Sequence, residues 1–258
     1  MSKSIYTEVV TLPSNGLLNP EIPNGEVTLR CVTVADQKFV SGTNLPGDLL
    51  VQELLRRCVE SPEGFDPAKL TSIDTFFLIT KLRILSYGGK YSFIVKCPEC
   101  GKKTEVELDL ADLTVDYLDP DYESKMKVKL PRTGDTVFTR LLTNNDDREI
   151  DKEAKRLSKK FKDSGDNEFI LRLVKSISRI ELKGSGENSN KIIEDPISIQ
   201  KYVENLTDLD ATAIMSTLSP TYGIQTSIET RCSECKEDIE VSLRFTPQFF
   251  RPKYDASH

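Results

Sequence analysis

The residues in this sequence best suited to chemistry are four cysteines arranged as two Cys-x-x-Cys pairs, Cys97/Cys100 and Cys232/Cys235. In a Cys-x-x-Cys spacing, two thiolates can bind one metal ion along one edge of a tetrahedron, and a second pair can supply the opposite edge. The sequence therefore predicts one site that holds a single Zn²⁺ ion. Four thiolates leave no open position for water, so this zinc would be structural.

The surroundings of the two pairs are duplicated. Residues 93–108 (FIVKCPECGKKTEVEL) align without a gap on residues 228–243 (IETRCSECKEDIEVSL), at an offset of 135. Apolar and polar residues alternate on both sides of each pair, which predicts a β-hairpin with two thiols at its tip. Two such hairpins facing each other would form a zinc ribbon. Basic residues that would offset the negative charge of a zinc–tetrathiolate centre lie nearby: Lys96, Lys102, Lys103, Arg231 and Lys236.

Three other uses of the cysteine pairs compete with zinc. Disulfides are rare in reducing compartments, and a thioredoxin-like redox pair needs a βαβ setting, whereas each pair here lies between strands. An iron–sulfur cluster could also use four thiolates, and zinc or iron stays open as the ion. Residues 101–231 separate the two pairs, far more than the usual spacing of about 15–20 residues. The intervening chain must therefore be an inserted domain.

Two further cysteines lie in apolar surroundings. Cys31 falls in a strand pattern and Cys58 in a helical pattern. Isolated cysteines in such settings behave as small buried hydrophobic residues. We expect no chemistry from either.

Composition excludes several classes of function. The chain has 258 residues, enough for one large domain or two smaller ones, and 38% of them are hydrophobic. Its one histidine is His258, so an ordered core can hold no Ser-His-Asp or Cys-His catalytic pair. No other spacing suggests catalysis. We therefore expect a protein that is not an enzyme and has no small-molecule substrate.

The charge pattern argues against nucleic acid and membrane as partners. The formal net charge is −6, whereas a general nucleic-acid binder needs a basic surface. The basic stretch at 152–162 follows acidic residues at 144–151, a pattern typical of a solvated helix. No apolar run approaches the roughly 18 residues that a membrane helix needs. Residues 1–4 lead into a polar segment rather than a signal core, which favours the cytosol.

The hydrophobic periodicity predicts an α+β fold. A zinc-ribbon-like pair of Cys-x-x-Cys hairpins, at 91–110 and 224–245, joins N-terminal α/β elements and a mainly helical insertion. Strand patterns cover 6–12, 26–34, 127–130 and 137–142. Helical patterns cover 44–60, 72–87, 147–161, 167–181, 198–206 and 208–218. We expect a discontinuous domain of residues 1–126 with 222–258, and an inserted domain at 127–221.

Two segments could contact a partner. Residues 13–25 (PSNGLLNPEIPNG) are rich in Pro, Asn and Gly, which predicts an irregular arm that could lie over another protein. Phe249 and Phe250 near the C-terminus could either anchor on the core or bind a partner as an exposed pair. The sequence leaves both alternatives open.

Several segments resemble the baseplate hub and hub-assembly proteins of T-even-like bacteriophages, and together they span most of the chain. These segments are 29–34, 49–59, 73–83 (IDTFFLITKLR), 97–101 (CPECG), 106–113, 131–144 (PRTGDTVFTRLLTN) with the helix that follows, 222–235 and 249–252 (FFRP).

The resemblance implies a role in building the central hub of a contractile-tail baseplate, as a structural subunit or a chaperone-like factor. The implied partners are other baseplate hub and tail proteins. The implied location is the host cell cytoplasm during assembly, or the tail baseplate of the virion. The alternative is a zinc-ribbon accessory protein of a transcription or replication machine. That alternative needs a basic hairpin surface, but acidic residues outnumber the basic ones there: Glu99, Glu105, Glu107, Glu234, Glu237, Asp238 and Glu240.

Overall fold

The chain forms two compact units in this computed structural model, which describes residues 6–160, 167–184, 191–219, 221–243 and 249. Unit 1 comprises Met1–Pro67, Ile73–Tyr117 and Tyr222–His258, and unit 2 comprises Ala68–Ser72 and Leu118–Thr221. The predicted mixture of helices and strands is confirmed. Whether residues 1–126 with 222–258, and residues 127–221, fold as separate domains stays a prediction. None of the described helices is long and apolar enough to cross a membrane.

The described part of unit 1 has a three-stranded antiparallel sheet in the order β1-β2-β3. The strands are β1 (Thr7–Thr11), β2 (Glu26–Arg30) and β3 (Val59–Ser61). β2 lies in the middle, and its side chains alternate, so Val27 and Leu29 are fully buried on one face. This alternation is typical of a sheet with one face against the core.

The segment between β1 and β2 is irregular, as the sequence predicts, and it packs against the rest of unit 1. Leu12 and Ile22 are buried, and the Leu12 N–H donates to the Gly25 carbonyl oxygen at 2.8 Å. Gly16 and Gly25 approach so closely that a Cβ on Gly16 would lie 2.6 Å from the Gly25 nitrogen. Glycine permits this contact because it lacks a side chain. The segment thus packs within unit 1, and that it lies over a partner stays a prediction.

The apolar pattern predicts one strand over 26–34, whereas the structure has helix α1 (Val34–Gly42) after a shorter strand. The strand ends at Arg30, and Thr33 caps the helix that follows. The Thr33 hydroxyl accepts from the Asp36 N–H, and the Asp36 carboxylate accepts from the Thr33 N–H. This capping box satisfies backbone donors at the start of the helix.

The other two long helices of unit 1 confirm the predictions. α2 (Gly47–Cys58) has Asp48 in its first turn and arginines in its last, which complements the helix dipole. α3 (Ser72–Tyr87) ends where Gly88 adopts a φ of +82°. The buried apolar side chains of these helices are Leu54, Leu55, Cys58, Phe77, Leu78, Ile79 and Leu82. Short 3₁₀ helices occur at η1 (Pro23–Gly25), η2 (Pro67–Lys69) and η3 (Leu110–Asp112).

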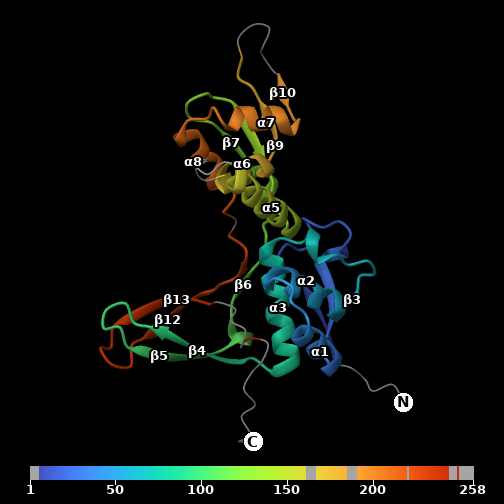
Figure 1. Cartoon of the computed structure of the whole chain (residues 1–258), viewed down its shortest axis with the longest axis vertical. Coiled ribbons are helices and arrows are strands. Elements are labelled where there is room, and N and C mark those ends of the chain that lie inside the picture. Colours follow the sequence, from blue (N-terminus) through green and yellow to red (C-terminus); the bar gives the residue numbers. More distant parts are fainter. Residues whose placement is uncertain (1–5, 161–166, 185–190, 220, 244–248, 250–258) are drawn as a thin grey trace, which may run out of the picture. The chain divides into compact units, whose positions relative to one another are not determined.

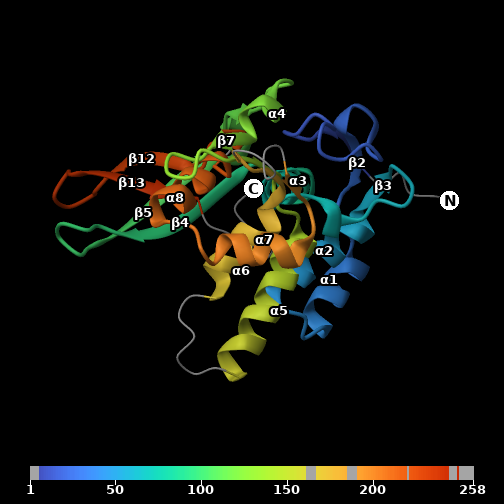
Figure 2. The same ribbon diagram turned by 90° about the horizontal axis from the view of Figure 1, so that it is seen from above.

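Two β-hairpins of unit 1 lie side by side with their tips at the same end (Figures 1 and 2). The first pairs β4 (Lys90–Lys96) with β5 (Lys103–Asp109), and the second pairs β12 (Ser227–Arg231) with β13 (Asp238–Ser242). A short ladder of β6 (Val115–Asp116) with β11 (Gly223–Ile224) ties the chain after the first hairpin to the chain before the second. Both hairpins stand where the sequence predicts them.

Unit 2 contains an antiparallel sheet with the order β10-β9-β8-β7 over the described residues. Its strands are β7 (Lys127–Lys129), β8 (Thr136–Thr139), β9 (Ile177–Glu181) and β10 (Ile192–Ile193). The helices are α4 (Tyr122–Lys125), α5 (Asn144–Lys160), α6 (Asn167–Ser176), α7 (Pro196–Val203) and α8 (Asp208–Thr217). The predicted mainly helical insertion is therefore confirmed.

One predicted helix of unit 2 is too long. The apolar spacing at 167–181 fits a helix throughout, yet α6 ends at Ser176 and β9 begins at Ile177. β9 pairs with β8, and the β-branched side chains of Ile177 and Ile180 are buried at 5% and 0% exposure. β-Branched residues fit a half-buried strand well, and this pairing overrides the local helical pattern.

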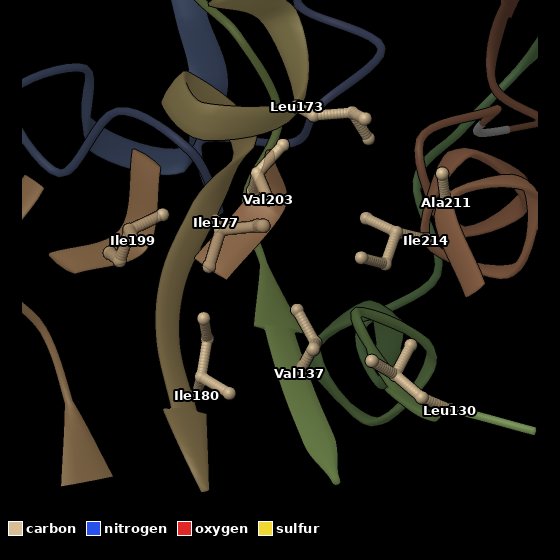
Figure 3. Packing of buried hydrophobic residues seen from close by; sticks show 9 residues of the cluster. All are labelled: Leu130, Val137, Leu173, Ile177, Ile180, Ile199, Val203, Ala211 and Ile214. Atoms are coloured by element: carbon tan, nitrogen blue, oxygen red, sulfur yellow. The ribbon is translucent and has the colours of Figure 1, made fainter. Parts of the chain in front are cut away.

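The hydrophobic core of unit 2 joins the sheet to three helices. Figure 3 shows Val137 of β8 and Ile177 of β9 beside Leu173, Val203 and Ile214, which come from α6, α7 and α8. Each of these side chains is at least 94% buried. The full cluster is Leu130, Val137, Leu173, Ile177, Ile180, Ile199, Val203, Ala211 and Ile214.

Candidate metal centre

The tip of the first hairpin is a tight turn that holds two thiols. The Cys97 N–H donates to the Lys102 carbonyl oxygen at 2.9 Å, and the Gly101 N–H donates to the Cys97 carbonyl oxygen at 3.0 Å. Gly101 has a φ of +71°, in the left-handed region that glycine adopts without strain. The turn thereby reverses the chain directly after Cys100.

The tip of the second hairpin repeats this turn. The Cys232 N–H donates to the Glu237 carbonyl oxygen at 2.8 Å, and the Lys236 N–H donates to the Cys232 carbonyl oxygen at 3.2 Å. Lys236 occupies the position of Gly101 and also has a positive φ, of +64°. A lysine accepts steric strain there that a glycine avoids. The two tips thus have the same backbone conformation despite different residues.

The four cysteine sulfurs of the two tips converge. Cys97 Sγ lies 3.7 Å from Cys235 Sγ, and Cys100 Sγ lies 3.6 Å from Cys232 Sγ. All four sulfurs lie within 4.8 Å of one another. A tetrahedron of sulfurs about 2.3 Å from a central zinc has edges of about 3.8 Å, whereas a disulfide bond is about 2.05 Å long. The separations therefore match a four-thiolate metal site, and the cysteines are free.

The two halves of the site differ in exposure. Cys97 and Cys232 are 1% exposed and pack with Ile239 and Val241, whereas Cys100 and Cys235 are exposed. The apolar contacts keep water from one side of the sulfur cluster. Metal–thiolate bonds are strengthened where water is excluded.

Backbone N–H groups of the second tip stabilise a thiolate. The N–H groups of Cys235 and Glu234 donate to the Cys232 sulfur, and they are the main cause that lowers its pKa to about 6. Hydrogen bonds to a charged group favour its ionised form. The turn therefore favours the thiolate form of Cys232, which is the form that can bind a metal ion.

The neighbouring sulfurs act in the opposite direction on Cys235. The Glu237 N–H lowers the pKa of this thiol, but desolvation and the sulfurs of Cys232, Cys100 and Cys97 together raise it to about 12. Hydrogen bonds to the protonated form of a thiol disfavour its ionisation. A cation shared by the four sulfurs would offset this effect.

Thr104 is a residue of the site that the sequence analysis missed. It lies on β5, is 5% exposed, and its hydroxyl donates to Cys232 Sγ at 3.7 Å. The same hydroxyl accepts from the Ser233 N–H at 3.4 Å. The aligned position of the other hairpin is Ile239, so a polar residue among inward-facing apolar ones was the available signal.

The predicted basic residues near the cysteines lie on the surface. Lys96, Lys102 and Lys103 are exposed on the first tip. On the second tip, Arg231 pairs with Asp238 at 2.8 Å, and Lys236 donates to the Ser233 carbonyl oxygen at 2.7 Å. They surround the site without entering it.

The remaining cysteines stand apart from this cluster. Cys58 is fully buried, and burial raises the pKa of its thiol to about 12. Cys31 is half-buried. The expectation of a small buried hydrophobic residue is confirmed for Cys58.

Phe249 is fully buried, with its ring 5.2 Å from the Tyr91 ring in an edge-on arrangement. This position agrees with the core-anchoring alternative. Phe250, Arg251 and Pro252 lie outside the described residues. That Phe249 and Phe250 bind a partner stays a prediction.

The model of a family described as T4 bacteriophage base plate protein matches residues 6–251. The matched stretch contains both cysteine pairs and the whole segment between them. No curated protein and no solved structure matches the chain.

Proposed function

Because the chain belongs to the T4 bacteriophage base plate protein family, we propose that it is a non-enzymatic component of the baseplate hub of a contractile tail. It acts either as a structural subunit or as a chaperone-like factor in hub assembly. The family match over residues 6–251 carries this proposal. A baseplate role follows from the family, whereas the hub and the assembly step are finer assignments that need a test.

The proposed hub protein contains one structural Zn²⁺ ion. Cys97, Cys100, Cys232 and Cys235 would hold it, since their sulfurs have the spacing of a tetrahedral thiolate shell. A shell closed by four thiolates leaves no position for substrate or reactive water. When bound, the ion would stabilise the two hairpins against each other rather than perform chemistry.

The sulfur spacing favours a single ion over a cluster. A multi-iron cluster holds several metal and sulfide atoms between its cysteine ligands, which requires more room than sulfurs within 4.8 Å provide. A lone iron would fit the same shell. Zinc is the commoner ion in paired Cys-x-x-Cys hairpins.

The absence of enzymatic activity is part of the proposal. In the described ranges, no histidine accompanies any of the cysteines, and His258 lies outside those ranges. A cysteine nucleophile is usually activated by a neighbouring base. The four clustered thiols are instead placed to bind one ion, so no small-molecule substrate is expected.

The surface of the hairpins does not favour the alternative of a nucleic-acid accessory protein. Acidic side chains that repel phosphate are exposed on both hairpins, namely Glu99, Glu105, Glu107, Glu229, Glu234, Glu237, Asp238 and Glu240. Nucleic-acid binding needs a basic stripe. A mobility-shift assay at low salt tests this alternative, and sequence-independent binding at micromolar protein would support it over the hub.

The hub proposal implies particular partners and locations. The partners are other hub and tail proteins, met in the host cell cytoplasm during assembly. A structural subunit would remain in the tail baseplate of the virion, whereas a chaperone-like factor would leave. Mass spectrometry of purified virions distinguishes the two, because only a subunit is recovered with the tail.

The decisive experiment is reconstitution. The full chain is co-expressed with candidate hub proteins of the same phage, and hub complexes are isolated with and without it. We expect hub assembly to fail or slow strongly when the chain is omitted. Hub complexes that form normally without it, in the same yield and at the same rate, would contradict the proposed role.

Metal analysis tests the zinc proposal separately. Purified protein is washed with a weak chelator, and its metals are measured by mass spectrometry. We expect one zinc per chain. A washed, folded chain without tightly bound metal would contradict the zinc site and leave the baseplate assignment intact.

A further inference from the structure

We propose that the chain is a tandem duplication of one module, and that the four-cysteine centre is the contact through which the two copies join. The first module runs from β1 to β5 and the second from β7 to β13. Apart from β10, α7 and β11 in the second module, each has the order strand, strand, helix, helix, strand, followed by a helix and a cysteine hairpin. The inference depends neither on the identity of the metal nor on a role in the hub.

The first shared feature is the turn from the central strand into the first helix. In each module, an arginine, a threonine and an aspartate follow one another at a spacing of three residues. The threonine precedes the helix, and the aspartate is its third residue. The two sets are Arg30, Thr33 and Asp36 before and in α1, and Arg140, Thr143 and Asp146 before and in α5.

The hydrogen bonds of the two turns agree bond by bond. In both, the arginine Nη1 donates to the aspartate Oδ2 at 2.7 Å, and the threonine N–H donates to the same oxygen at 2.9 Å. The threonine hydroxyl donates to it at 2.7 Å in the first module and 2.8 Å in the second. The arginine also donates to the carbonyl oxygen of the residue after it, Cys31 or Leu141.

The second shared feature is the loop between the first two strands. It begins with a Leu-Pro-x-x-Gly sequence in both modules, at 12–16 (LPSNG) and 130–134 (LPRTG). The leucines are 0% and 1% exposed, and the glycines have φ values of +74° and +76°. Both loops therefore place a leucine in the core and reverse the chain at the same position.

A buried aspartate fixes each of these loops. The N–H of the residue after the proline donates to an aspartate Oδ1, from Ser14 to Asp74 at 3.1 Å and from Arg132 to Asp210 at 2.9 Å. Both aspartates are 0% exposed, and each is the third residue of its helix, α3 or α8. The same tie thus joins the same two elements in both modules.

The third shared feature is the passage from the second helix into the third strand. α2 runs directly into β3 at Val59, and α6 runs directly into β9 at Ile177. These first strand residues pair with Leu29 and Thr139, and in both modules the register shifts at that pair. A bulge is a specific local feature rather than a common background one.

The hairpins complete the correspondence. Their alignment extends upstream to Tyr87-Gly88 and Tyr222-Gly223, and both glycines have positive φ, +82° and +106°.

A helix cap alone recurs in unrelated proteins. Four features that occur in the same order, each with matching bonds or backbone angles, point to one ancestral module. The second copy differs by an insertion that carries β10 and α7.

The sulfur contacts show how the two copies join. The first cysteine of each pair contacts the second cysteine of the other pair, Cys97 with Cys235 and Cys232 with Cys100. Such a reciprocal contact, in which residue i of one surface meets residue j of the other and j meets i, is typical of two equivalent surfaces related by a two-fold axis. One pair supplies only half of a four-thiolate shell. The surface that completes it is a second copy of the same hairpin.

An exchange of the hairpin tips in the full chain tests whether the two tips are equivalent halves of the four-cysteine centre. Residues 96–103 and 231–238 are swapped in register, and a control swaps them with a shift of one residue, which turns the thiols to the other face. We expect the in-register variant to keep one metal ion per chain, with an affinity within about tenfold of the parent. The shifted control should lose it.

A second exchange tests the duplication without metal. Residues 31–35 and 141–145 are swapped, and the control carries the same swapped residues rotated by one position, so that threonine no longer precedes either helix. We expect the in-register variant to unfold within about 2 °C of the parent and the control at least about 3 °C lower. An in-register exchange that behaves like its control, at either the tips or the turns, would overturn the inference.

Discussion

The two modules have the same framework but different surroundings, most clearly at the strand-to-helix turn. In the first module, the side chains of Arg30 and Asp36 are 15% and 4% exposed, whereas those of Arg140 and Asp146 in the second are 41% and 11% exposed. The bonds are the same in both settings. An ion pair that is exposed to water contributes little to stability. What the two ion pairs share is therefore a geometric role, which is to set the direction in which the helix leaves the strand. The energetic contribution of the turn should therefore differ between modules, although its geometry does not.

The two hairpin tips differ in the same way. They present sulfurs at matching separations, yet one turn uses Gly101 where the other uses Lys236, and one inner face has Thr104 where the other has Ile239. The thiols are the part that the two tips share. The supporting residues vary, and the Thr104 hydroxyl of the first hairpin donates to Cys232 Sγ of the second.

The largest expected effect tests whether the two tips are equivalent. Cys97→Ser and Cys232→Ser each open the four-thiolate shell, so both variants should lose stoichiometric zinc and destabilise the hairpins by several kcal/mol. Metal analysis and hydrogen exchange of the hairpin peptides measure this. Cys31→Ser is the matched control, because Cys31 lies outside the sulfur cluster, and it should keep its metal. Full metal content in either tip variant would refute the joint site.

The next effect separates the two strand-to-helix turns. Asp36→Asn leaves the poorly exposed Arg30 without its charge partner, which should cost about 3 kcal/mol. Asp146→Asn leaves the half-exposed Arg140, where water compensates, and should cost about 2 kcal/mol or less. Hydrogen exchange of peptides from α1 and α5 reports on each module separately. A larger loss of stability for Asp146→Asn than for Asp36→Asn would contradict the proposed difference between the two turns.

Acid tests the two carboxylates together. Burial raises the pKa of both carboxyls, but the bonds from arginine and threonine outweigh it and lower the pKa of Asp36 and Asp146 to about 2. An unfolded aspartate has a pKa of about 3.9, so the folded state binds protons less readily. Each carboxylate thus stabilises its module above about pH 5, and this contribution is lost as the pH falls from about 4 to 2.

Urea denaturation at pH 6, 4 and 2.5 checks this dependence. Asp36→Asn and Asp146→Asn serve as controls, because each variant lacks one of the titrating groups and should show a shallower decline with acid. A decline as steep in the double variant as in the parent would assign the acid sensitivity to other carboxyls.

Much of this site could be predicted from the sequence, because the signals that identify it lie within short segments of the chain. The spacing of the cysteines and the duplicated residues around them identify all four thiols. Helices α2 and α3 follow from their periodicity and their end signals. Thr104 could not be found this way, since its partner Cys232 is 128 residues away.

The failures elsewhere have non-local causes. α1 begins where side-chain bonds from Arg30, Thr33 and Asp36 end the strand, although the apolar pattern continues. β9 is a strand because β8 pairs with it from 38 residues earlier, at the pair Thr139 and Ile177. The duplication was visible only at the hairpins, because the offset between the modules changes from 118 at the Leu-Pro loops to 110 at the helix caps and 135 at the cysteines.

A smaller effect tests the asymmetry between the inner faces. Thr104→Val keeps the volume and removes the hydroxyl that donates to Cys232 Sγ, so zinc affinity should fall about tenfold. Chelator competition measures this. Thr104→Ser keeps the hydroxyl and should retain most of the affinity, which separates the hydrogen bond from packing. Equal affinities for the valine and serine variants would assign Thr104 a packing role alone.

The smallest effect concerns the left-handed residue of each turn. Lys236→Gly removes the strain of a positive φ and should stabilise the second tip by about 0.5–1 kcal/mol, less the exposed bond from Lys236 to Ser233. Gly101→Ala should destabilise the first tip by about 1 kcal/mol. A Cβ there would meet only Lys96 Cε at 3.6 Å, an ordinary contact, so backbone strain alone would cause the loss. Thermal unfolding of the zinc-loaded chain measures both changes in stability. If the two turns are equivalent, Lys236→Gly must stabilise the chain and Gly101→Ala must destabilise it. A destabilising Lys236→Gly would show that the lysine side chain contributes more than the conformation costs, and that the two tips have diverged in how they hold their thiols.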